Sequence, residues 1–302
     1  MTKQHTMKDS VRKSARRGKK RRENELSKKL VVAGTNANGI KSKRQSFLHW
    51  LENDNPQVVM IQETKATQEN QFNVPGYKVL EKVRKGKGGG GVMICIRKDI
   101  DGVPVVVSNH DDDVEILVIE IALKAMTIRF LTGYGPQEDA AEDTINKFYA
   151  AFEEELIRCE EDNCGFIAEL DFNAKLGMEV LKGDPNPMSD NGKLMWDIVQ
   201  RHECTVVNTT ELCKGTITRS RMKKQIKEES VLDDVIINAR IQPFLQQMEI
   251  DEAKTKTTIY KGKSSNIRSQ YPYLHLQYPS QQEATSTDRS IQIAKRRRTT
   301  TI

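Results

Sequence analysis

CGFIAELDFNAKLG, residues 164–177, is the stretch that decides the fold. Its first half is a short apolar run of strand length, and the chain leaves that run with Asp171 and Asn173. Because side chains alternate along a strand, two residues spaced by two point to the same side. The stretch therefore predicts a buried strand that carries a carboxylate able to take or give a proton and an amide able to hold a phosphate oxygen.

Similar apolar runs, rich in Val and Ile, surround this stretch. They cover residues 30–33, 58–61, 91–96, 103–107, 115–121 and 126–134. Their length and composition predict strands that pair into sheets. Between them, apolar residues recur at helical spacing at positions 47, 48 and 51, and again at 145, 148, 152 and 156. Strand meanders mixed with strand-to-helix units predict an α+β layered sandwich rather than a pure parallel sheet.

The composition divides the chain into three segments. Residues 1–29 hold twelve Lys or Arg against three acidic residues, and we predict that they form a basic disordered tail. Residues 30–263 carry the strand and helix patterns, and residues 264–302 lose this periodicity and contain more basic than acidic residues, which predicts a second disordered tail. Cationic tails around an acidic body suit a protein that binds a polyanion, although such charge runs equally keep a tail solvated.

Several functional classes are disfavoured by the sequence. No apolar stretch is long enough for a bilayer span and the first residues lack the apolar core of a secretion signal, so we expect an intracellular protein with no membrane partner. The five cysteines form no CxxC pair and indicate ordinary thiols in a reducing compartment. GKGGGG at 86–91 lacks the ending of a P-loop and indicates a hairpin connection. KKRR at 19–22 and KRRR at 295–298 predict nuclear import, and no obligate protein partner is evident.

Further polar candidates stand at the ends of predicted strands. Asn36 and Asn38 follow the first strand, and an asparagine offers a neutral oxygen to a metal or amide hydrogens to a phosphate. Glu63 follows a wholly apolar strand and is able to bind a hard cation or merely to solvate the strand end. Tyr134 ends another strand, where its hydroxyl could bond a phosphate oxygen or its ring could cover the core. Asp233 begins a final strand together with its neighbour Asp234.

Taken in this order, the motifs resemble the endonuclease/exonuclease/phosphatase superfamily. The resemblance is greatest to the endonuclease domains of non-LTR (LINE-type) retrotransposons and their craniofacial-development-protein-like relatives. The motifs that carry it are IQETK, DFNAKLG, DNGKLMWDIVQRHECTVVNT, and GTITR followed by SVLDD. The resemblance spans residues 30–263 and implies a four-layered α/β/β/α sandwich, in which two mixed sheets pack face to face and helices lie outside.

The resemblance also implies roles for the polar candidates. Glu63 would be the principal ligand of Mg²⁺ or Mn²⁺, with Asn36 and Asn38 beside it. Asp171 would act on the attacking water or on the leaving oxygen. Asn173 and Tyr134 would position the scissile phosphate, and Asp233 would orient a histidine. Thr216 and Ser230 would bind the substrate.

One family motif is missing. The histidine should come from a serine-aspartate-histidine tripeptide after Asp233, and the chain has none. His275 alone follows Asp233, and its context YPYLHLQY is that of a tail residue rather than a catalytic one. Since the strand and helix pattern and the motif are lost at the same place, we hypothesise that the chain after about Lys263 has been altered by a frameshift, an altered splice or decay of the element. Loss of such a group typically costs roughly 10²–10⁴-fold in rate.

The sequence therefore predicts a Mg²⁺-dependent phosphodiesterase, foremost a DNA-nicking endonuclease derived from a mobile element and impaired by loss of this motif. One alternative is a phosphatase or RNA exonuclease of the same superfamily, with RNA rather than DNA as the partner in the latter case. The other alternative is a catalytically inactive nucleic-acid-binding remnant.

Overall fold

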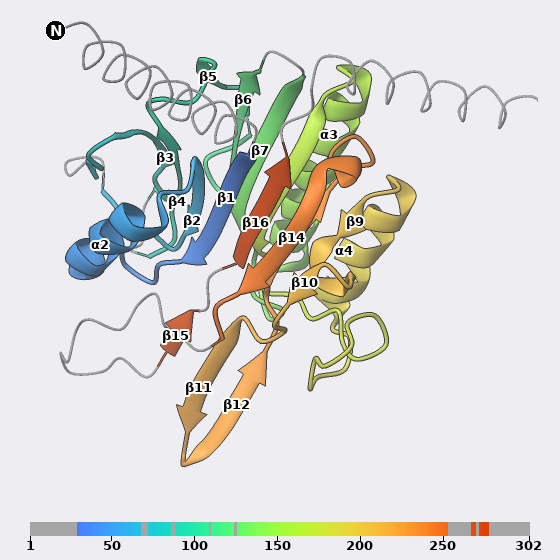
Figure 1. Cartoon of the computed structure of the whole chain (residues 1–302). Helices are drawn as coiled ribbons and strands as arrows, with labels where there is room; N and C mark the ends of the chain where they lie inside the picture. The colour runs from blue at the N-terminus through green and yellow to red at the C-terminus, as the bar shows by residue number, and fades with distance from the viewer. Residues whose placement is uncertain are drawn as a thin grey trace, which may run out of the picture.

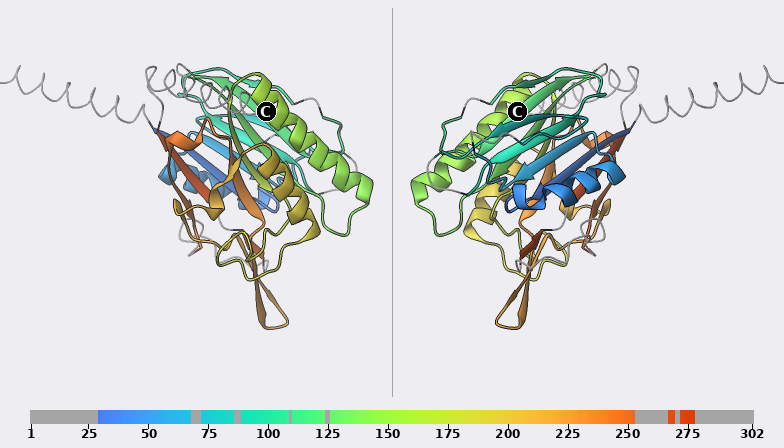
Figure 2. Two further views of the ribbon diagram at one scale, coloured as in Figure 1. Left: turned by 90° about the vertical axis from the view of Figure 1, so that its right-hand side faces the viewer. Right: turned by 90° about the vertical axis from the view of Figure 1, so that its left-hand side faces the viewer.

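The fold is a sandwich of two β-sheets with helices on both outer faces, as the sequence predicts (Figure 1). It is seen in a computed structural model that describes residues 29–67, 72–85, 89–108, 110–123, 126–252, 267–269 and 272–277. Aliphatic side chains from both sheets fill the space between them and form the largest apolar core. Figure 2 shows the four layers from the side.

The first sheet has seven strands in the order β10-β14-β16-β1-β2-β4-β3. In that order they span Cys213–Lys214, Leu245–Ile250, Pro272–Gln277, Lys29–Asn36, Val58–Gln62, Val92–Arg97 and Tyr77–Lys82. Strands β1 and β2 are parallel, so both end at the same edge of the sheet.

The second sheet has six strands in the order β5-β6-β7-β8-β13-β9. In that order they span Pro104–Val106, Ile116–Ala122, Thr127–Tyr134, Gly165–Asp171, Asp233–Ile237 and Thr205–Val206. Strands β7 and β8 are parallel, whereas β13 runs antiparallel to β8 and places Asp233 opposite Asp171. The end of β8 and the start of β13 therefore meet at one edge.

Helices cover the two outer faces. Helix α2 (Arg44–Asp54) packs on the first sheet, and helices α3 (Glu142–Glu161) and α4 (Asp190–Arg201) pack on the second (Figure 2). Three short 3-10 helices, η1 (Lys41–Lys43), η2 (Val207–Thr209) and η3 (Gln242–Phe244), connect strands and helices. None of the helices in the described ranges combines the length and the apolar character that crossing a bilayer requires.

A three-stranded sheet lies beside the sandwich, in the order β12 (Ile226–Ser230), β11 (Arg219–Lys223) and β15 (Ile267–Ser269). Strands β11 and β12 form a hairpin that projects from the body of the molecule (Figure 1). Its two turn residues, Lys224 and Gln225, both have positive φ, at 46° and 67°. Two such residues give a tight turn whose twist matches that of the strands.

The predicted disordered tail at 264–302 is wrong for residues 267–269 and 272–277, which form β15 and β16. Strand β16 pairs with both β1 and β14, and it buries Leu274 and Leu276 in the core between the sheets. The alternation of buried leucines is what an in-frame core strand encodes, and it argues against a frame change before this strand. The rest of this segment lies outside the described residues, and so does the predicted basic tail at 1–29, except for Lys29, which begins β1.

Candidate active site

Four strand ends bring the polar candidates to one rim of the sandwich. Asn36 ends β1 and Glu63 directly follows β2, which is the parallel neighbour of β1 in the first sheet. Tyr134 ends β7 and Asp171 ends β8, and these two residues are register partners in the second sheet. The site therefore lies where the ends of two parallel strand pairs, one from each sheet, face each other.

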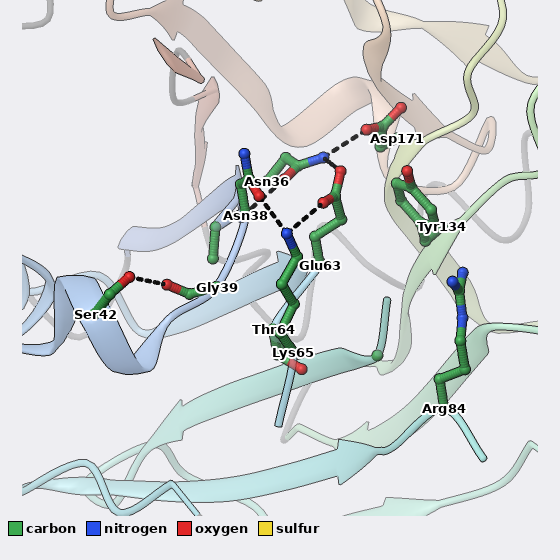
Figure 3. Close-up of polar contacts among 12 residues, drawn as sticks. Asn36, Asn38, Gly39, Ser42, Glu63, Thr64, Lys65, Arg84, Tyr134 and Asp171 are labelled. Atoms are coloured by element: carbon green, nitrogen blue, oxygen red, sulfur yellow. Dashed lines mark hydrogen bonds and ion pairs between the residues drawn. The ribbon is translucent and has the colours of Figure 1, made fainter. Parts of the chain in front are cut away.

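One amide group joins the two sheets at this rim. Asn36 Nδ2 donates a hydrogen bond to Glu63 Oε1 at 2.9 Å and another to Asp171 Oδ2 at 2.6 Å (Figure 3). Two carboxylates that are far apart in the sequence thus share one donor. Like charges so close repel each other, and structures keep such an arrangement where a cation or a reacting group compensates the repulsion.

The backbone around these side chains is strained. Asn38, Glu63, Lys65 and Asn173 all have φ between 43° and 50°, in the left-handed region that non-glycine residues rarely adopt. Surrounding hydrogen bonds hold this geometry, including Gly39 N to Glu63 O at 2.8 Å and the nitrogen of residue 65 to Gly90 O at 2.8 Å. Strain of this kind gathers at functional sites, where the surroundings fix the side-chain direction.

A cation already lies among the oxygen atoms of the site. Lys65 Nζ is 2.5 Å from Asn38 Oδ1 and 3.8 Å from Glu63 Oε2 (Figure 3). Nearby, Lys43 Nζ donates to Ala37 O at 2.5 Å, and burial lowers the pKa of Lys43 while the charge of Glu63 raises it. The rim therefore has the electrostatic character of a cation site.

The donor atoms suit a hard divalent cation. Across the described ranges, no group of three or more His, Cys, Asp or Glu side chains is able to hold a metal ion. An ion at this rim would rest on Glu63, on Asn36 and Asn38, and on oxygens of water and substrate. One or two carboxylates with such oxygens are what Mg²⁺ prefers.

The asparagine of the decisive stretch, Asn173, orients Asp171. The backbone nitrogen of Asn173 donates to Asp171 Oδ1 at 3.1 Å, and Asn173 Nδ2 donates to Gly135 O at 2.8 Å. Gln137 Nε2 donates to Asn173 Oδ1 at 2.8 Å and lies 3.4 Å from the Tyr134 hydroxyl oxygen. Asp171, Asn173 and Tyr134 thus lie together, and Gln137 joins them.

Burial and mutual repulsion raise the pKa values of the acids around Asp171. Burial raises the pKa of Asp171 to about 6, against hydrogen bonds from Asn36 and Asn173 that lower it. Burial raises the pKa of Asp233 well above its usual range, and the charge of Asp171 adds to this. Burial also raises the pKa of Glu169 to about 8. Oδ1 of Asp233 and Oε1 of Glu169 are buried without a partner in the described structure.

Within the described residues, neither of the two predicted substrate residues hydrogen-bonds to the side chains of these acids. Thr216 is half-buried, and its backbone nitrogen donates to Glu252 at 2.5 Å. Ser230 is buried and pairs with Arg219 in the hairpin. Instead, Thr218 Oγ1 accepts a hydrogen bond from the backbone nitrogen of Asp233 at 3.2 Å and so holds the start of β13. Thr216 and Thr218 are two residues apart in GTITR, so this spacing could have drawn attention to Thr218 as well.

An arginine that the sequence did not single out lies over the tyrosine ring. The guanidinium carbon of Arg84 is 5.7 Å from the centre of the Tyr134 ring (Figure 3). Arg84 Nε donates to Glu115 Oε1 at 2.5 Å, and Glu115 Oε2 accepts from the nitrogen of Gly91 at 2.5 Å. Burial raises the pKa of Tyr134 to about 12, helped by the charges of Glu63 and Asp171, so its hydroxyl keeps its proton at neutral pH.

No described histidine lies beside Asp171 or Asp233. His49 contacts Asn53, while His110 and His202 contact glutamates of helix α3. His275 is a strand residue rather than the predicted tail residue, and it lies opposite Val31. Val31 is five residues before Asn36, which ends β1, and this separation is about 16 Å at the usual rise per residue.

With this geometry in place, comparison with known proteins decides the family. A profile of the Endonuclease/Exonuclease/phosphatase family matches residues 33–203, more than half of the chain. The chain belongs to this family. Its members are hydrolytic nucleases and phosphatases, and the nucleases among them generally use divalent metal ions. No curated protein matches the sequence.

Solved structures share the fold at low sequence identity. The AP endonuclease LMAP from Leishmania major is 14% identical, with a TM-score of 0.66 over 84% of this chain and 89% of that one. The endonuclease domain of TRAS1, a telomere-specific non-LTR retrotransposon, is 15% identical, with a TM-score of 0.61 over 83% of this chain and all of that one. The 3′ phosphatase NExo from Neisseria, bound to a product DNA hairpin, is 14% identical, with a TM-score of 0.60 over 83% of this chain and 100% of that one.

Proposed function

We propose that the chain is a divalent-metal-dependent phosphodiesterase that nicks DNA and derives from a mobile element. The observation that carries this proposal is the bridge from Asn36 Nδ2 to both Glu63 and Asp171. It joins the candidate metal ligand of one sheet to the candidate proton-transfer group of the other. Phosphodiester hydrolysis needs both within reach of one phosphate.

Each side chain at the rim has a chemical task in this proposal. Asp171, with a pKa of about 6, is mostly ionised at neutral pH and accepts a proton from the water that attacks phosphorus. Asn173 and Tyr134 donate hydrogen bonds to the oxygens of the scissile phosphate and hold it in line. Glu63, with Asn36 and Asn38, would hold Mg²⁺ or Mn²⁺, which when bound supplies positive charge against the charge that develops on the phosphate.

The β11–β12 hairpin supports a nucleic-acid substrate. It projects from the body, and its side chains at Lys224 and Lys227 are exposed. The base of the hairpin is close to the site. This follows from Arg219 at the start of β11, whose charge lowers the pKa of Asp171. Exposed lysines that project beside a phosphodiesterase site suit the backbone of a nucleic acid. One of the similar structures holds a DNA hairpin, and two are named endonucleases, which favours DNA.

The test is nicking of supercoiled plasmid by the full chain with and without Mg²⁺. We expect open-circular product that requires the ion and is lost in Glu63→Gln and in Asp171→Asn. The matched control is Asp197→Asn, an exposed aspartate on helix α4. Nicking that survives undiminished in both site variants would remove the proposal.

The second candidate is a nucleic-acid-binding remnant, and the placement of the described histidines favours it. Ser269 ends β15 opposite Arg219, and Gln270 and Tyr271 follow it in the sequence. The family motif is serine, aspartate, histidine, so these two residues occupy the positions of the missing pair by sequence. Both lie outside the described residues.

A rescue experiment separates the two candidates. If the chain is an impaired nuclease, Gln270→Asp combined with Tyr271→His should raise the nicking rate by roughly 10²–10⁴-fold. DNA binding without nicking, unchanged by the double substitution, identifies the remnant. Release of phosphate from a 3′-phosphorylated oligonucleotide, or stepwise shortening of labelled RNA, would instead identify the phosphatase or the exonuclease of the same family.

Nuclear localisation is a separate part of the proposal. It rests on the basic clusters at 19–22 and 295–298, which are also suited to nonspecific phosphate contacts. A fluorescent fusion of the full chain should accumulate in the nucleus, and alanine substitution of both clusters should abolish that accumulation. An unchanged distribution would contradict it.

A further inference from the structure

Two cysteine thiols meet at the opposite end of the strand that carries Asp171. Cys159 lies in the last turn of helix α3, and Cys164 directly precedes strand β8. Their Sγ atoms are 2.6 Å apart, and each residue is only 1% exposed. The turn that joins them comes to the surface at Asp162 and Asn163, which are exposed.

The backbone holds the two cysteines side by side. Cys164 N donates a hydrogen bond to Cys159 O at 3.1 Å, and the Cys159 thiol lies 3.2 Å from Cys164 O. Asn238, the residue after β13, clamps the pair from the next strand, because its Nδ2 donates to Cys164 O at 2.9 Å. A disulfide requires neighbouring backbones with converging Cβ atoms, and this turn provides both.

A buried guanidinium lies beside the pair. Arg129 on β7 is next to the start of β8, since its register partner is Phe166. Its Nε donates to Glu120 at 3.1 Å and its Nη2 pairs with Asp162, whereas its Nη1 is buried and has no partner in the described structure. The hydrogen bond with Cys159 lowers the pKa of Cys164, and the charge of Arg129 lowers it further, against burial.

We propose that Cys159 and Cys164 are a dithiol that a hydroperoxide converts into a disulfide across the α3–β8 turn. The Cys164 thiolate attacks the peroxide, the O–O bond breaks, and a sulfenic acid forms as the alcohol, or water in the case of hydrogen peroxide, leaves. The Cys159 sulfur then attacks that sulfur, the S–OH bond breaks, and water leaves with the thiol proton. Two thiols and one peroxide thus give one disulfide, with the peroxide reduced.

The unpaired Nη1 of Arg129 stabilises the thiolate that starts this reaction, as a nearby arginine does at reactive cysteines. The product closes a loop of six residues, 159–164, so the loop-entropy gain is small. It should raise the melting temperature by roughly 4–8 °C. The dithiol is independent of the proposed nuclease function, since Asp171 is seven residues away along an extended strand, about 23 Å.

The experiment treats the reduced full-length protein with hydrogen peroxide and then unfolds it in denaturant, so that buried thiols become accessible. Free thiols are blocked with an isotopically light maleimide, the protein is reduced, and the released thiols are labelled with a heavy one. Peptide mapping should show heavy label on Cys159 and Cys164 together, and light label on Cys95, Cys204 and Cys213. The melting temperature should rise with the same peroxide dependence and return after reduction. Wild-type mapping requires no substitution, so a folding defect in a variant cannot obscure it.

Two variants separate a specific dithiol from general oxidation. Cys164→Ser should lose both the crosslink and the rise in melting temperature, whereas the matched control Cys213→Ser should keep both. Light label on both cysteines in oxidised native protein would overturn the proposal. A crosslink from Cys159 to Cys204, whose charge also acts on Cys159, would overturn the pairing.

Discussion

Strand β8 has interacting side chains at each end, which are acidic at its last residue and thiols at its start. At its last residue, Asp171 shares a hydrogen-bond donor with Glu63 and lies opposite Asp233, and the surrounding backbone is left-handed at several non-glycine residues. At its start, Cys164 packs against Cys159 in an apolar layer, and Cys164 N donates a hydrogen bond to Cys159 O. One strand thus joins a destabilised rim to a well-packed turn.

The difference follows from what burial does to each group. A buried carboxylate loses its hydration and repels its neighbours, so the rim keeps its acids at a cost in folding free energy. A buried thiol is small and nearly apolar, and it packs like any core side chain. Burial at the thiol end therefore favours the folded state, whereas burial of the acids at the other end costs folding free energy and places reactive groups together.

The largest expected effect is on nicking at the acidic end. Asp171→Asn should lower the nicking rate by roughly 10²–10⁴-fold, because the neutral amide accepts no proton from water. The same change should raise the melting temperature at pH 8, since ionised Asp171 opposes folding. Plasmid nicking and thermal melts measure both. A variant that loses activity and also loses stability would break the comparison between the two ends.

The next effect concerns Glu169, whose pKa is raised by burial from an ordinary 4.5 to about 8. Because the folded state binds this proton more tightly than the unfolded state, stability is present at low pH and is lost as pH rises from about 4.5 to about 8. The loss should approach roughly 5 kcal/mol above pH 8.

Glu169→Gln should remove this part of the pH dependence. Denaturant unfolding at pH 5 and pH 9 should show little difference from wild type at the lower pH and a more stable variant at the higher pH. The matched control is Glu52→Gln on the exposed face of α2. An equal effect of the Glu169 change at both pH values would show that its charge is not the cause.

A smaller effect is expected at the β11–β12 hairpin. Lys224→Glu with Lys227→Glu should weaken DNA binding by about tenfold and reduce the salt slope by at most about two, because two phosphate contacts are lost. The control pair is Lys78→Glu with Lys98→Glu, exposed lysines near the opposite end of β2. Fluorescence anisotropy at several salt concentrations measures the difference, and equal weakening by both pairs would indicate a general charge effect.

The smallest effect is expected from Arg84, which lies over the Tyr134 ring. Arg84→Lys should lower kcat by about threefold to tenfold with little change in KM, since the tyrosine loses the planar contact that positions it. Arg44→Lys is the matched control, because Arg44 lies over Phe72 at 5.6 Å and donates a hydrogen bond to Asn73 O rather than to a residue of the site. A rise in KM with an unchanged kcat would assign Arg84 to substrate contact instead.

Much of this architecture is readable from short segments. The apolar runs before Asn36, Glu63, Tyr134 and Asp171 are strands. Their short length and their enrichment in β-branched residues favour a buried strand over a buried helix. Strand β16 was missed, since its two core leucines are separated by His275 and flanked by polar residues. Thr218 and Arg84 were missed because each acts through a distant partner.

The contact between the two cysteines was also missed from the sequence. Cys159 and Cys164 are separated by four residues without a recognised motif, so the sequence indicated isolated thiols. A helix end followed by a left-handed residue, Asn163 at φ 53°, turns the chain back and brings them together. Contacts made by a turn depend on dihedral angles that composition does not specify.

By itself the sequence determined most of the strands around the site and which residues stand at their ends, because hydrophobic periodicity and turn chemistry are local properties. Tertiary structure alone decided that Asn36 bridges Glu63 and Asp171, that buried acids share the rim, and that His275 lies far from them. These are facts about the packing of two sheets. Packing depends on how distant segments fill one volume, and no local stretch of the chain encodes that distance.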